Sequence, residues 1–206
     1  MPRPRIHDPD AVLDAAESLA VRAGPAAVTI RAVAAATGAS NGAIYHTFGS
    51  RGELLARAWL RGAHRFLAMQ TELVDPLLRE SDGLAAVLAA ATTPADFARQ
   101  FPDSARLLLA LDRAELFTEV PEPVAADLAE TDKTLLAVLI RLAHCLWGRR
   151  DRHAVDTITL CVVDLPTAIL LRRDRLTPAA DPDSLAREHL RAAVRAVVAL
   201  GPTPGS

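Results

Sequence analysis

Apolar residues recur at intervals of three and four along nearly the whole chain, and no segment has a convincing strand pattern. Such intervals place apolar side chains on one face of an α-helix. The pattern therefore predicts an all-α protein. Three short helices are expected within residues 1–50, and longer helices beyond them.

Capping residues mark the first two helices. Asp8 is suited to the N-cap of the first helix, with Pro9 at its first position, and this helix is expected to stop at Gly24-Pro25. The second helix is expected to begin after Thr29 and to end at Gly38, because glycine readily takes the left-handed conformation that follows many helices.

Two serines mark the next two helix starts. Ser40 can cap a third helix that runs to about Phe48. Ser50 and Glu53 are predicted to form a capping box, in which each side chain accepts a hydrogen bond from the other residue's amide. The fourth helix is expected to be long. Its apolar stripe consists of Leu55, Trp59, Gly62, Phe66, Met69 and Leu73.

Turn residues divide the rest of the chain. Breaks are expected at 75–76, 82–83, 93–94 and 101–102. Two longer helices are expected at about 122–147 and 152–173, followed by a polar linker at 174–183 and a last helix that ends near residue 200. Residues 202–206 are expected to form a disordered tail.

Charge is distributed unevenly. Residues 1–65 hold eight arginines and five acidic residues, a net charge of +3. The remaining residues hold fifteen basic and twenty acidic side chains, a net charge of −5. A basic N-terminal part on an acidic body suits a protein whose N-terminal part alone meets phosphates.

Composition excludes several other classes of protein. The first ten residues contain no apolar signal segment. The longest apolar stretch, 158–171, is interrupted by Asp164 and Pro166 and is shorter than a bilayer requires. Cys145 and Cys161 lack metal-ligand spacing, which favours reduced thiols in the cytoplasm. No metal and no cofactor are expected.

Residues 30–48 have the layout of a helix-turn-helix, with two short helices joined by a turn that contains Gly38. The wider segment 29–55 reads TIRAVAAATGASNGAIYHTFGSRGELL and resembles the DNA-binding segment of the TetR (tetracycline repressor) family. The matching positions are Thr29, Val33, Ala34, Gly38, Ser40, Gly42, Ile44, Tyr45, Phe48, Ser50, Leu54 and Leu55. The departures are Thr47, where the family usually has His or Tyr, Arg51 for Lys, and Gly52 for an acidic residue.

The candidate DNA-binding residues lie within this segment and are Thr29, Arg31, Ser40, Asn41, Gly42, Tyr45, His46, Thr47 and Arg51. Small side chains at the start of the third helix let its backbone approach DNA. Thr29 and Arg51 can bind phosphates, and Asn41 and His46 can read base edges. The resemblance places a phosphate-contacting hydroxyl at Tyr45.

Each of these residues also has a purely structural interpretation. Thr29, Ser40 and Ser50 are suited to helix caps, with or without a DNA contact. Tyr45 can instead close the small core. Arg3 and Arg5 form either a minor-groove arm or a solvated, frayed end.

The resemblance implies a cytoplasmic homodimer that binds a palindromic operator, with residues 1–50 as the DNA-binding domain and 51–201 as the ligand-sensing and dimerisation domain. A small-molecule effector is expected to release this regulator, most simply a repressor, from double-stranded DNA. The segment 158–171 is apolar almost all round, so it and the last helix either pair with a partner subunit or pack into a monomeric core.

Polar groups that interrupt apolar runs, and the aromatic residues of the body, are the candidates for an effector pocket. They are Phe66, Met69, Phe97, Phe101, Leu108, Asp112, Phe117, His144, Trp147 and Asp164. Such polar groups are expected either to have partners in the protein or to face a cavity. The alternative is an all-helical enzyme or metal-binding protein that uses Asp112, His144 and Asp164, although no catalytic sequence motif supports it.

Overall fold

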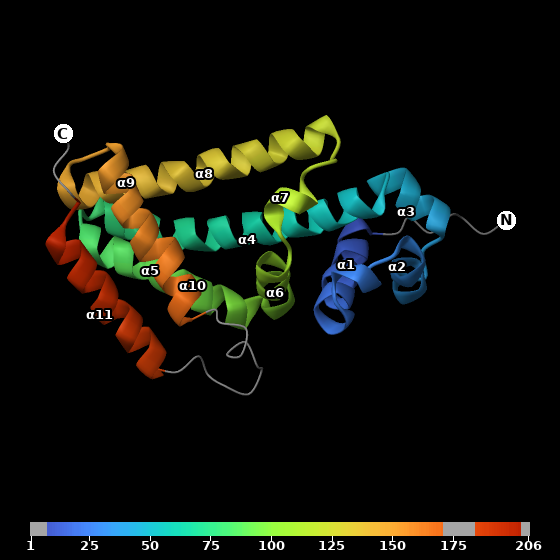
Figure 1. Ribbon diagram of the computed structural model, residues 1–206, viewed down its shortest axis with the longest axis horizontal. Coiled ribbons are helices and arrows are strands. Elements are labelled where there is room, and N and C mark those ends of the chain that lie inside the picture. Colours follow the sequence, from blue (N-terminus) through green and yellow to red (C-terminus); the bar gives the residue numbers. More distant parts are fainter. Residues whose placement is uncertain (1–7, 171–183, 203–206) are drawn as a thin grey trace. The chain divides into compact units, whose positions relative to one another are not determined.

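The computed structural model describes residues 8–170 and 184–202, and in this part of the chain all regular structure is helical (Figure 1). The predicted all-α fold is confirmed. The chain divides into two compact units: Met1–Ala63 with Asp103–Thr131, and His64–Pro102 with Asp132–Ser206. We call them unit 1 and unit 2. The Arg3–Arg5 arm, the linker 174–183 and most of the tail lie outside the described residues.

Unit 1 contains the three predicted N-terminal helices. Its helices are α1 (Pro9–Ala23), the 3₁₀ turn η1 (Pro25–Ala27), α2 (Ile30–Thr37), α3 (Asn41–Phe48), the first part of α4 (Arg51–Arg79), α6 (Pro102–Ala110), α7 (Arg113–Leu116) and the first part of α8 (Glu122–Trp147). The predicted N-caps accept hydrogen bonds from backbone amides: Asp8 from Asp10 at 3.0 Å, Thr29 from Ala32 at 3.0 Å and Ser40 from Ala43 at 3.1 Å.

The capping box at the start of α4 is only half formed. Ser50 Oγ accepts from the amide of Glu53 at 3.0 Å, as predicted. The amide of Ser50 donates to the carbonyl of Phe48. The Glu53 carboxylate is engaged by Arg57, one turn further along α4, with its Nε at 2.8 Å. The reciprocal half of the box is therefore wrong, because an ion pair on α4 takes the carboxylate.

Unit 2 is built around a core of small apolar side chains. Its helices are the rest of α4, α5 (Gly83–Gln100), the rest of α8, α9 (Arg152–Thr159), α10 (Leu165–Ile169) and α11 (Ser184–Leu200). Fully buried core residues include Val87, Leu142, Ile158, Leu190 and Val194. None of the helices in the described ranges is long and apolar enough to cross a membrane.

Two predicted helix breaks, at 75–76 and 93–94, are wrong. Pro76 lies inside α4 and Pro94 lies inside α5. Proline has no amide hydrogen, so Pro94 leaves the carbonyl of Ala90 without its usual helical donor. The side chain of Gln70, from α4, lies over that carbonyl, with Nε2 at 3.4 Å from the oxygen. Packing between α4 and α5 thus supplies the hydrogen bond that the sequence of α5 lacks.

The helix expected over 152–173 is also interrupted. Between α9 and α10 the chain forms a π-helical turn, Leu160–Asp164, in which the amide of Leu165 donates to the carbonyl of Leu160. The turn precedes Pro166, which has no amide hydrogen. Leu160 and Val163 are 39% and 36% exposed, so the stretch is not covered on all sides within this chain.

Candidate nucleic-acid interface and effector cavity

The turn between α2 and α3 has the geometry that the sequence predicts. Gly38 has a φ of 70° and a ψ of 9°, the left-handed conformation, and its amide donates to the carbonyl of Ala34. Val33 and Ile44 are buried on the inner faces of the two helices, and Phe48 closes the end of α3. Apolar anchors on both helices therefore hold α3 in a fixed orientation within unit 1.

The predicted DNA-binding side chains are all exposed and lie on or beside α2 and α3. They are Thr29, Arg31, Ser40, Asn41, Gly42, Tyr45, His46, Thr47 and Arg51. Thr29 and Ser40 also cap their helices, as the structural interpretation proposes. Tyr45 is 55% exposed, so the alternative in which it closes the core is wrong.

Arg51 has a structural role that the sequence did not reveal. Its Nε donates to the carbonyl of Val28 at 2.5 Å and one Nη donates to the carbonyl of Pro25 at 2.6 Å. The side chain therefore ties the start of α4 to the segment before α2. Two of its donor groups are used inside unit 1 and not for a phosphate.

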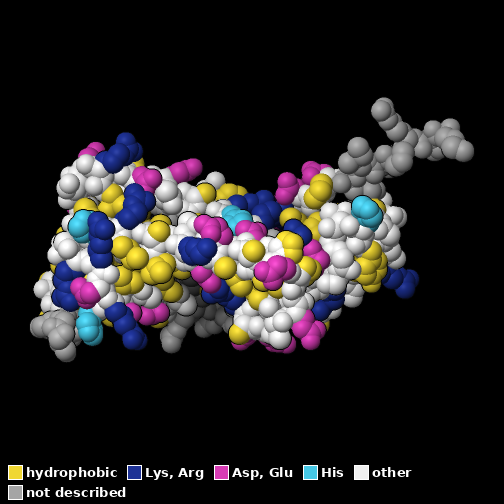
Figure 2. Space-filling model, turned by 90° about the horizontal axis from the view of Figure 1, so that it is seen from above, with side chains coloured by type: hydrophobic (Ala, Val, Ile, Leu, Met, Phe, Trp, Pro, Cys, Tyr) yellow, Lys and Arg dark blue, Asp and Glu magenta, His cyan; other side chains and the backbone are white. Residues whose placement is uncertain are grey.

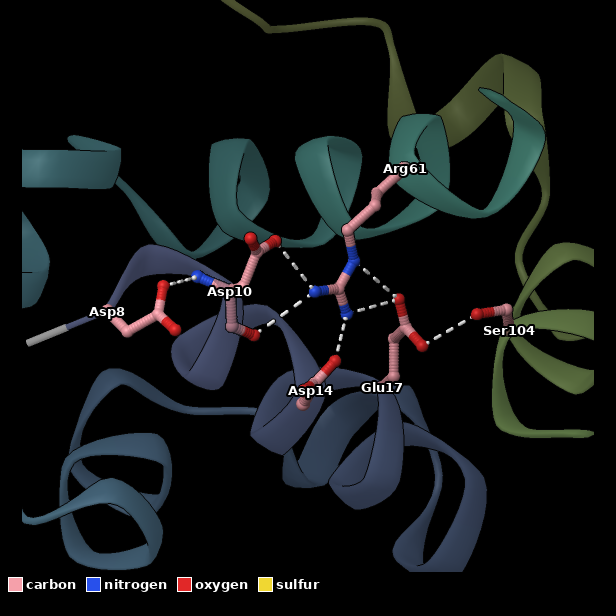
Figure 3. A network of polar contacts seen from close by, with 6 residues as sticks. All are labelled: Asp8, Asp10, Asp14, Glu17, Arg61 and Ser104. Carbon is pink, nitrogen blue, oxygen red and sulfur yellow. Dashed lines mark hydrogen bonds and ion pairs between the residues drawn. The ribbon is translucent and has the colours of Figure 1, made fainter. Parts of the chain in front are cut away.

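A buried network on the other side of α1 holds the unit together (Figure 3). Arg61 of α4 points at α1, where its Nη2 lies 2.7 Å from Glu17 Oε1 and 2.7 Å from Asp14 Oδ1. The other oxygen of Glu17 accepts a hydrogen bond from Ser104 Oγ of α6 at 2.8 Å. Figure 3 shows the Glu17 carboxylate between the side chains of Arg61 and Ser104. One carboxylate thus joins three helices.

The acidic side chains of this network stabilise the positive charge of Arg61. Burial disfavours the charged guanidinium, but the hydrogen bond and charge of Glu17, with Asp10 and Asp14, raise the pKa of Arg61 above its usual value. Sequence reasoning did not single out these residues. The available signal was Glu17 itself, a carboxylate one turn from both Leu13 and Ala20 on the buried face of α1.

Comparison with known proteins identifies the N-terminal part of unit 1. Residues 12–58, which contain α2, α3 and the start of α4, match the family described as bacterial regulatory proteins, tetR family. They form a TetR-family DNA-binding domain. The TetR resemblance and the helix-turn-helix are therefore confirmed, and a DNA-binding transcriptional regulator is the class of protein that this fold supports.

Solved structures share the fold along nearly the whole chain. A transcriptional regulator from Rhodococcus sp. Rha1 is 22% identical with a TM-score of 0.71, over 96% of this chain and 100% of that one. A tetR-family regulatory protein from Rhodococcus RHA1 is 20% identical with a TM-score of 0.66, over 96% and 98%. The multidrug binding protein EbrR, complexed with imidazole, is 23% identical with a TM-score of 0.63, over 99% and 96%. No curated protein sequence matches significantly.

Four of the predicted effector residues gather in unit 2 of the TetR-type fold. The rings of Phe66 and Phe97 meet edge to face at 5.5 Å, and Phe97 and Phe101 lie 5.4 Å apart. Met69 and Phe101 line a cavity of about 530 Å³ between α4 and α5. The other lining residues are Arg65, Ala68, Glu72, Leu73, Asp96, Arg99 and Gln100.

The remaining effector candidates do not join this group. Leu108, Asp112 and Phe117 belong to unit 1, where the ring of Phe117 packs edge to face on Trp59. Trp147 of unit 2 packs against that unit's apolar core. None of these four residues is part of the described lining of the cavity.

The three polar candidates are not buried in apolar surroundings. Asp112, His144 and Asp164 are all exposed. Asp112 caps α7 by accepting a hydrogen bond from the amide of Glu115 at 3.0 Å. Of the two expectations for this residue, a partner in the protein is therefore the one that the structure shows. Asp112 is in unit 1, whereas the other two are in unit 2. Among the described residues, no three His, Cys, Asp or Glu side chains are placed to hold a metal ion.

Proposed function

We propose that this chain is a ligand-responsive repressor of transcription that acts in the cytoplasm, binds a palindromic operator as a homodimer and is released by a small molecule. Residues 1–50 are assigned to DNA recognition and 51–201 to sensing and dimerisation. The observation that carries the proposal is the exposed polar face of α3, whose opposite face is anchored by Ile44 and Phe48.

The exposed side chains divide by reach and chemistry. Asn41 and His46 carry groups that can hydrogen-bond to base edges in the major groove. Tyr45, Thr29 and Arg31 carry donors for phosphate oxygens. The hydroxyl of Thr47 donates to the carbonyl of Ala43 at 3.0 Å and would have to turn to contact DNA. Gly42 adds no side chain beside Ser40, so the amides of Asn41 and Gly42 remain accessible to DNA, while the amide of Ala43 donates to Ser40.

Selection of bound genomic fragments by the purified protein tests the proposal and identifies the operator. On that operator, Tyr45→Phe is expected to weaken binding about tenfold, because a hydrogen bond to a charged phosphate contributes about 1.5 kcal/mol. His46→Ala should change the preferred base at one position of each half-site. Fluorescence anisotropy on operators with single base changes separates the two roles, since loss of a phosphate contact weakens binding to every operator alike, whereas loss of a base contact relaxes the preference at one position.

His153→Ala is the matched control, because it changes an exposed histidine of α9 in unit 2, away from the proposed DNA-binding face and subunit interface. Its affinity and base preference should equal those of the unmodified protein. Arg51→Ala would remove a candidate phosphate contact and also the hydrogen bonds to the carbonyls of Val28 and Pro25. A loss of DNA binding in this variant would therefore have two causes. Unchanged binding in both Tyr45→Phe and His46→Ala would overturn the proposed DNA-binding face.

Exposed apolar side chains on the last helices support the homodimer. Leu160, Val163 and Leu185 are 39%, 36% and 51% exposed. Large apolar side chains of this kind are a typical part of subunit interfaces. Leu185→Glu should give monomers in sedimentation velocity, whereas Leu136→Glu, a similar change at a 48% exposed leucine of α8, should leave the dimer intact. A dimer in the first variant would contradict this interface.

The cavity between α4 and α5 is the proposed effector site. Apolar Met69, Leu73 and Phe101 lie beside charged Arg65 and Glu72, a lining that suits an amphiphilic molecule. The fold is shared with a protein described as a multidrug binding protein, which supports a small-molecule ligand here. To act as an inducer, a ligand must bind the DNA-free conformation more tightly, typically by about 1–3 kcal/mol.

A screen of amphiphilic compounds by thermal shift provides candidate effectors. A compound that stabilises the protein should also release the operator, and Phe101→Ala should reduce both effects. Leu136→Glu, which is expected to leave the dimer intact and lies outside the cavity lining, is the comparison and should retain both effects. Retention of both effects in Phe101→Ala would place the effector elsewhere.

A further inference from the structure

A second cavity in unit 2 lies away from the proposed effector site. Its volume is about 490 Å³, and it is lined by Leu78, Arg79, Ser81, Arg141, His144 and Cys145. These residues come from the end of α4, the turn into α5 and the last turns of α8. In Figure 2, dark blue and cyan side chains are frequent at the end of unit 2 where α8 leads into α9. No acidic side chain is among the described residues that line this cavity.

The walls of the cavity are held together by a close helix contact. Gly83, the first residue of α5, lies against the backbone of α8, and a Cβ added there would be 2.8 Å from Cα of Leu146. A larger residue does not fit without moving one helix. The turn that carries Ser81 is therefore fixed next to the part of α8 that carries His144 and Cys145.

Asp75 holds both arginines of the cavity. Its backbone carbonyl accepts from Nε of Arg79 at 3.3 Å, and its carboxylate accepts from Nη2 of Arg141 at 2.7 Å. These contacts use one nitrogen of each guanidinium. Two positive side chains are thus oriented in advance, and each has further N–H groups with which to bind an anion.

Ser81 occupies a position that favours glycine. Its φ is +59°, and it is the only non-glycine residue with a positive φ in the described ranges. The amides of Ser81 and Asp82 donate to the carbonyls of Leu78 and Leu77, the pattern of a Schellman helix end. Glycine would adopt this backbone conformation with less strain than serine does. Serine instead places a hydroxyl at the lining of the cavity.

We propose that this cavity binds a phosphate group, through Arg79 and Arg141 with the Ser81 hydroxyl and the His144 ring as further donors. Guanidinium groups match tetrahedral oxyanions because they donate two parallel hydrogen bonds and keep their charge at every physiological pH. The described lining holds two guanidinium groups and no carboxylate, and the carboxylate of Asp75 pairs with Arg141 only, so the remaining positive charge favours an anion over a cation. The phosphate is either inorganic phosphate or the terminal group of a phosphate monoester.

Titration of the full-length protein with inorganic phosphate tests the site, with sodium chloride at equal ionic strength as reference. At fixed pH, phosphate should shift the side-chain NMR signal of His144 in a saturable manner, whereas chloride should not. Glycerol phosphate distinguishes the sources. Tighter binding than inorganic phosphate indicates a monoester, and weaker binding indicates the free ion.

Arg79→Gln and Arg141→Gln should each weaken phosphate binding about tenfold, the usual size of a lost charge-assisted hydrogen bond. Arg150→Gln, at an exposed arginine of the same unit outside the lining, is the matched control and should bind as the unmodified protein does. Ser81→Gly removes the hydroxyl without straining the turn, so it should fold and bind several-fold more weakly. An equal response to chloride, or equal phosphate affinity in Arg79→Gln and Arg150→Gln, would overturn the proposal.

Discussion

Nη2 of Arg61 lies 2.7 Å from Oε1 of Glu17, and this contact joins α4 to the buried face of α1. The side chains are only 12% and 5% exposed, so water does not replace either partner when the other is removed. The same carboxylate binds Ser104 of α6. One buried carboxylate of α1 therefore binds both α4 and α6 in unit 1.

Glu17→Ala is expected to destabilise unit 1 by about 2 kcal/mol, because it leaves a largely buried guanidinium and the Ser104 hydroxyl without their shared acceptor. Asp14→Ala, at a 65% exposed partner of the same arginine, should cost less than about 1 kcal/mol. Urea unfolding followed by circular dichroism measures both. Equal losses would mean that Glu17 has no special structural role.

The hydrogen bond from Gln70 to the carbonyl of Ala90 can be tested by a double-mutant cycle with Pro94. Gln70→Met should lower the free energy of unfolding by about 1–3 kcal/mol, since it leaves the carbonyl of Ala90 without a donor. In a Pro94→Ala background the residue at position 94 has its own amide hydrogen and can donate to that carbonyl. In that background Gln70→Met should lower the free energy of unfolding by a smaller amount. If the effects of the two substitutions on the free energy of unfolding simply add, this account is contradicted.

Asp151 should titrate at unusually low pH. The guanidinium of Arg149 donates to both carboxylate oxygens and, with the amide of Ala154, lowers the pKa of Asp151 to about 2. Because the folded pKa is below the unfolded one, this contribution to stability is complete above about pH 4 and is lost as the pH falls towards 2. NMR titration should show a higher midpoint for Asp151 in Arg149→Ala than in the unmodified protein, and an unchanged midpoint in Arg150→Ala. The same midpoint in all three proteins would contradict the assignment.

The two cysteines should differ in reactivity. Burial raises the pKa of Cys161 to about 11, and its side chain is fully buried, so almost no thiolate is available at pH 8. Cys145 is only partly buried. A colorimetric thiol reagent should therefore label the native protein quickly at one site, which Cys145→Ser removes. Rapid labelling that persists in Cys145→Ser would show that Cys161 is accessible.

Local sequence was sufficient for the ends of helices α1, α2 and α3 and for the turn between α2 and α3. The caps at Asp8, Thr29 and Ser40 and the left-handed Gly38 depend on interactions within a few residues, so their positions can be read from the chain. The exposed positions of Tyr45 and His46 follow from the helical period once Ile44 and Phe48 are assigned to the core.

Tertiary structure decided the features that depend on contacts between distant segments. Pro94 does not end α5, because Gln70 from another helix supplies the missing donor to Ala90. Arg51 binds inside unit 1 because the carbonyls of Val28 and Pro25, 23 and 26 residues earlier in the chain, are packed beside it. Glu17 is stable in the interior only because Arg61 and Ser104 come from 44 and 87 residues further along the chain. Helical period and capping are local properties, whereas the partner of a buried polar group is set by packing.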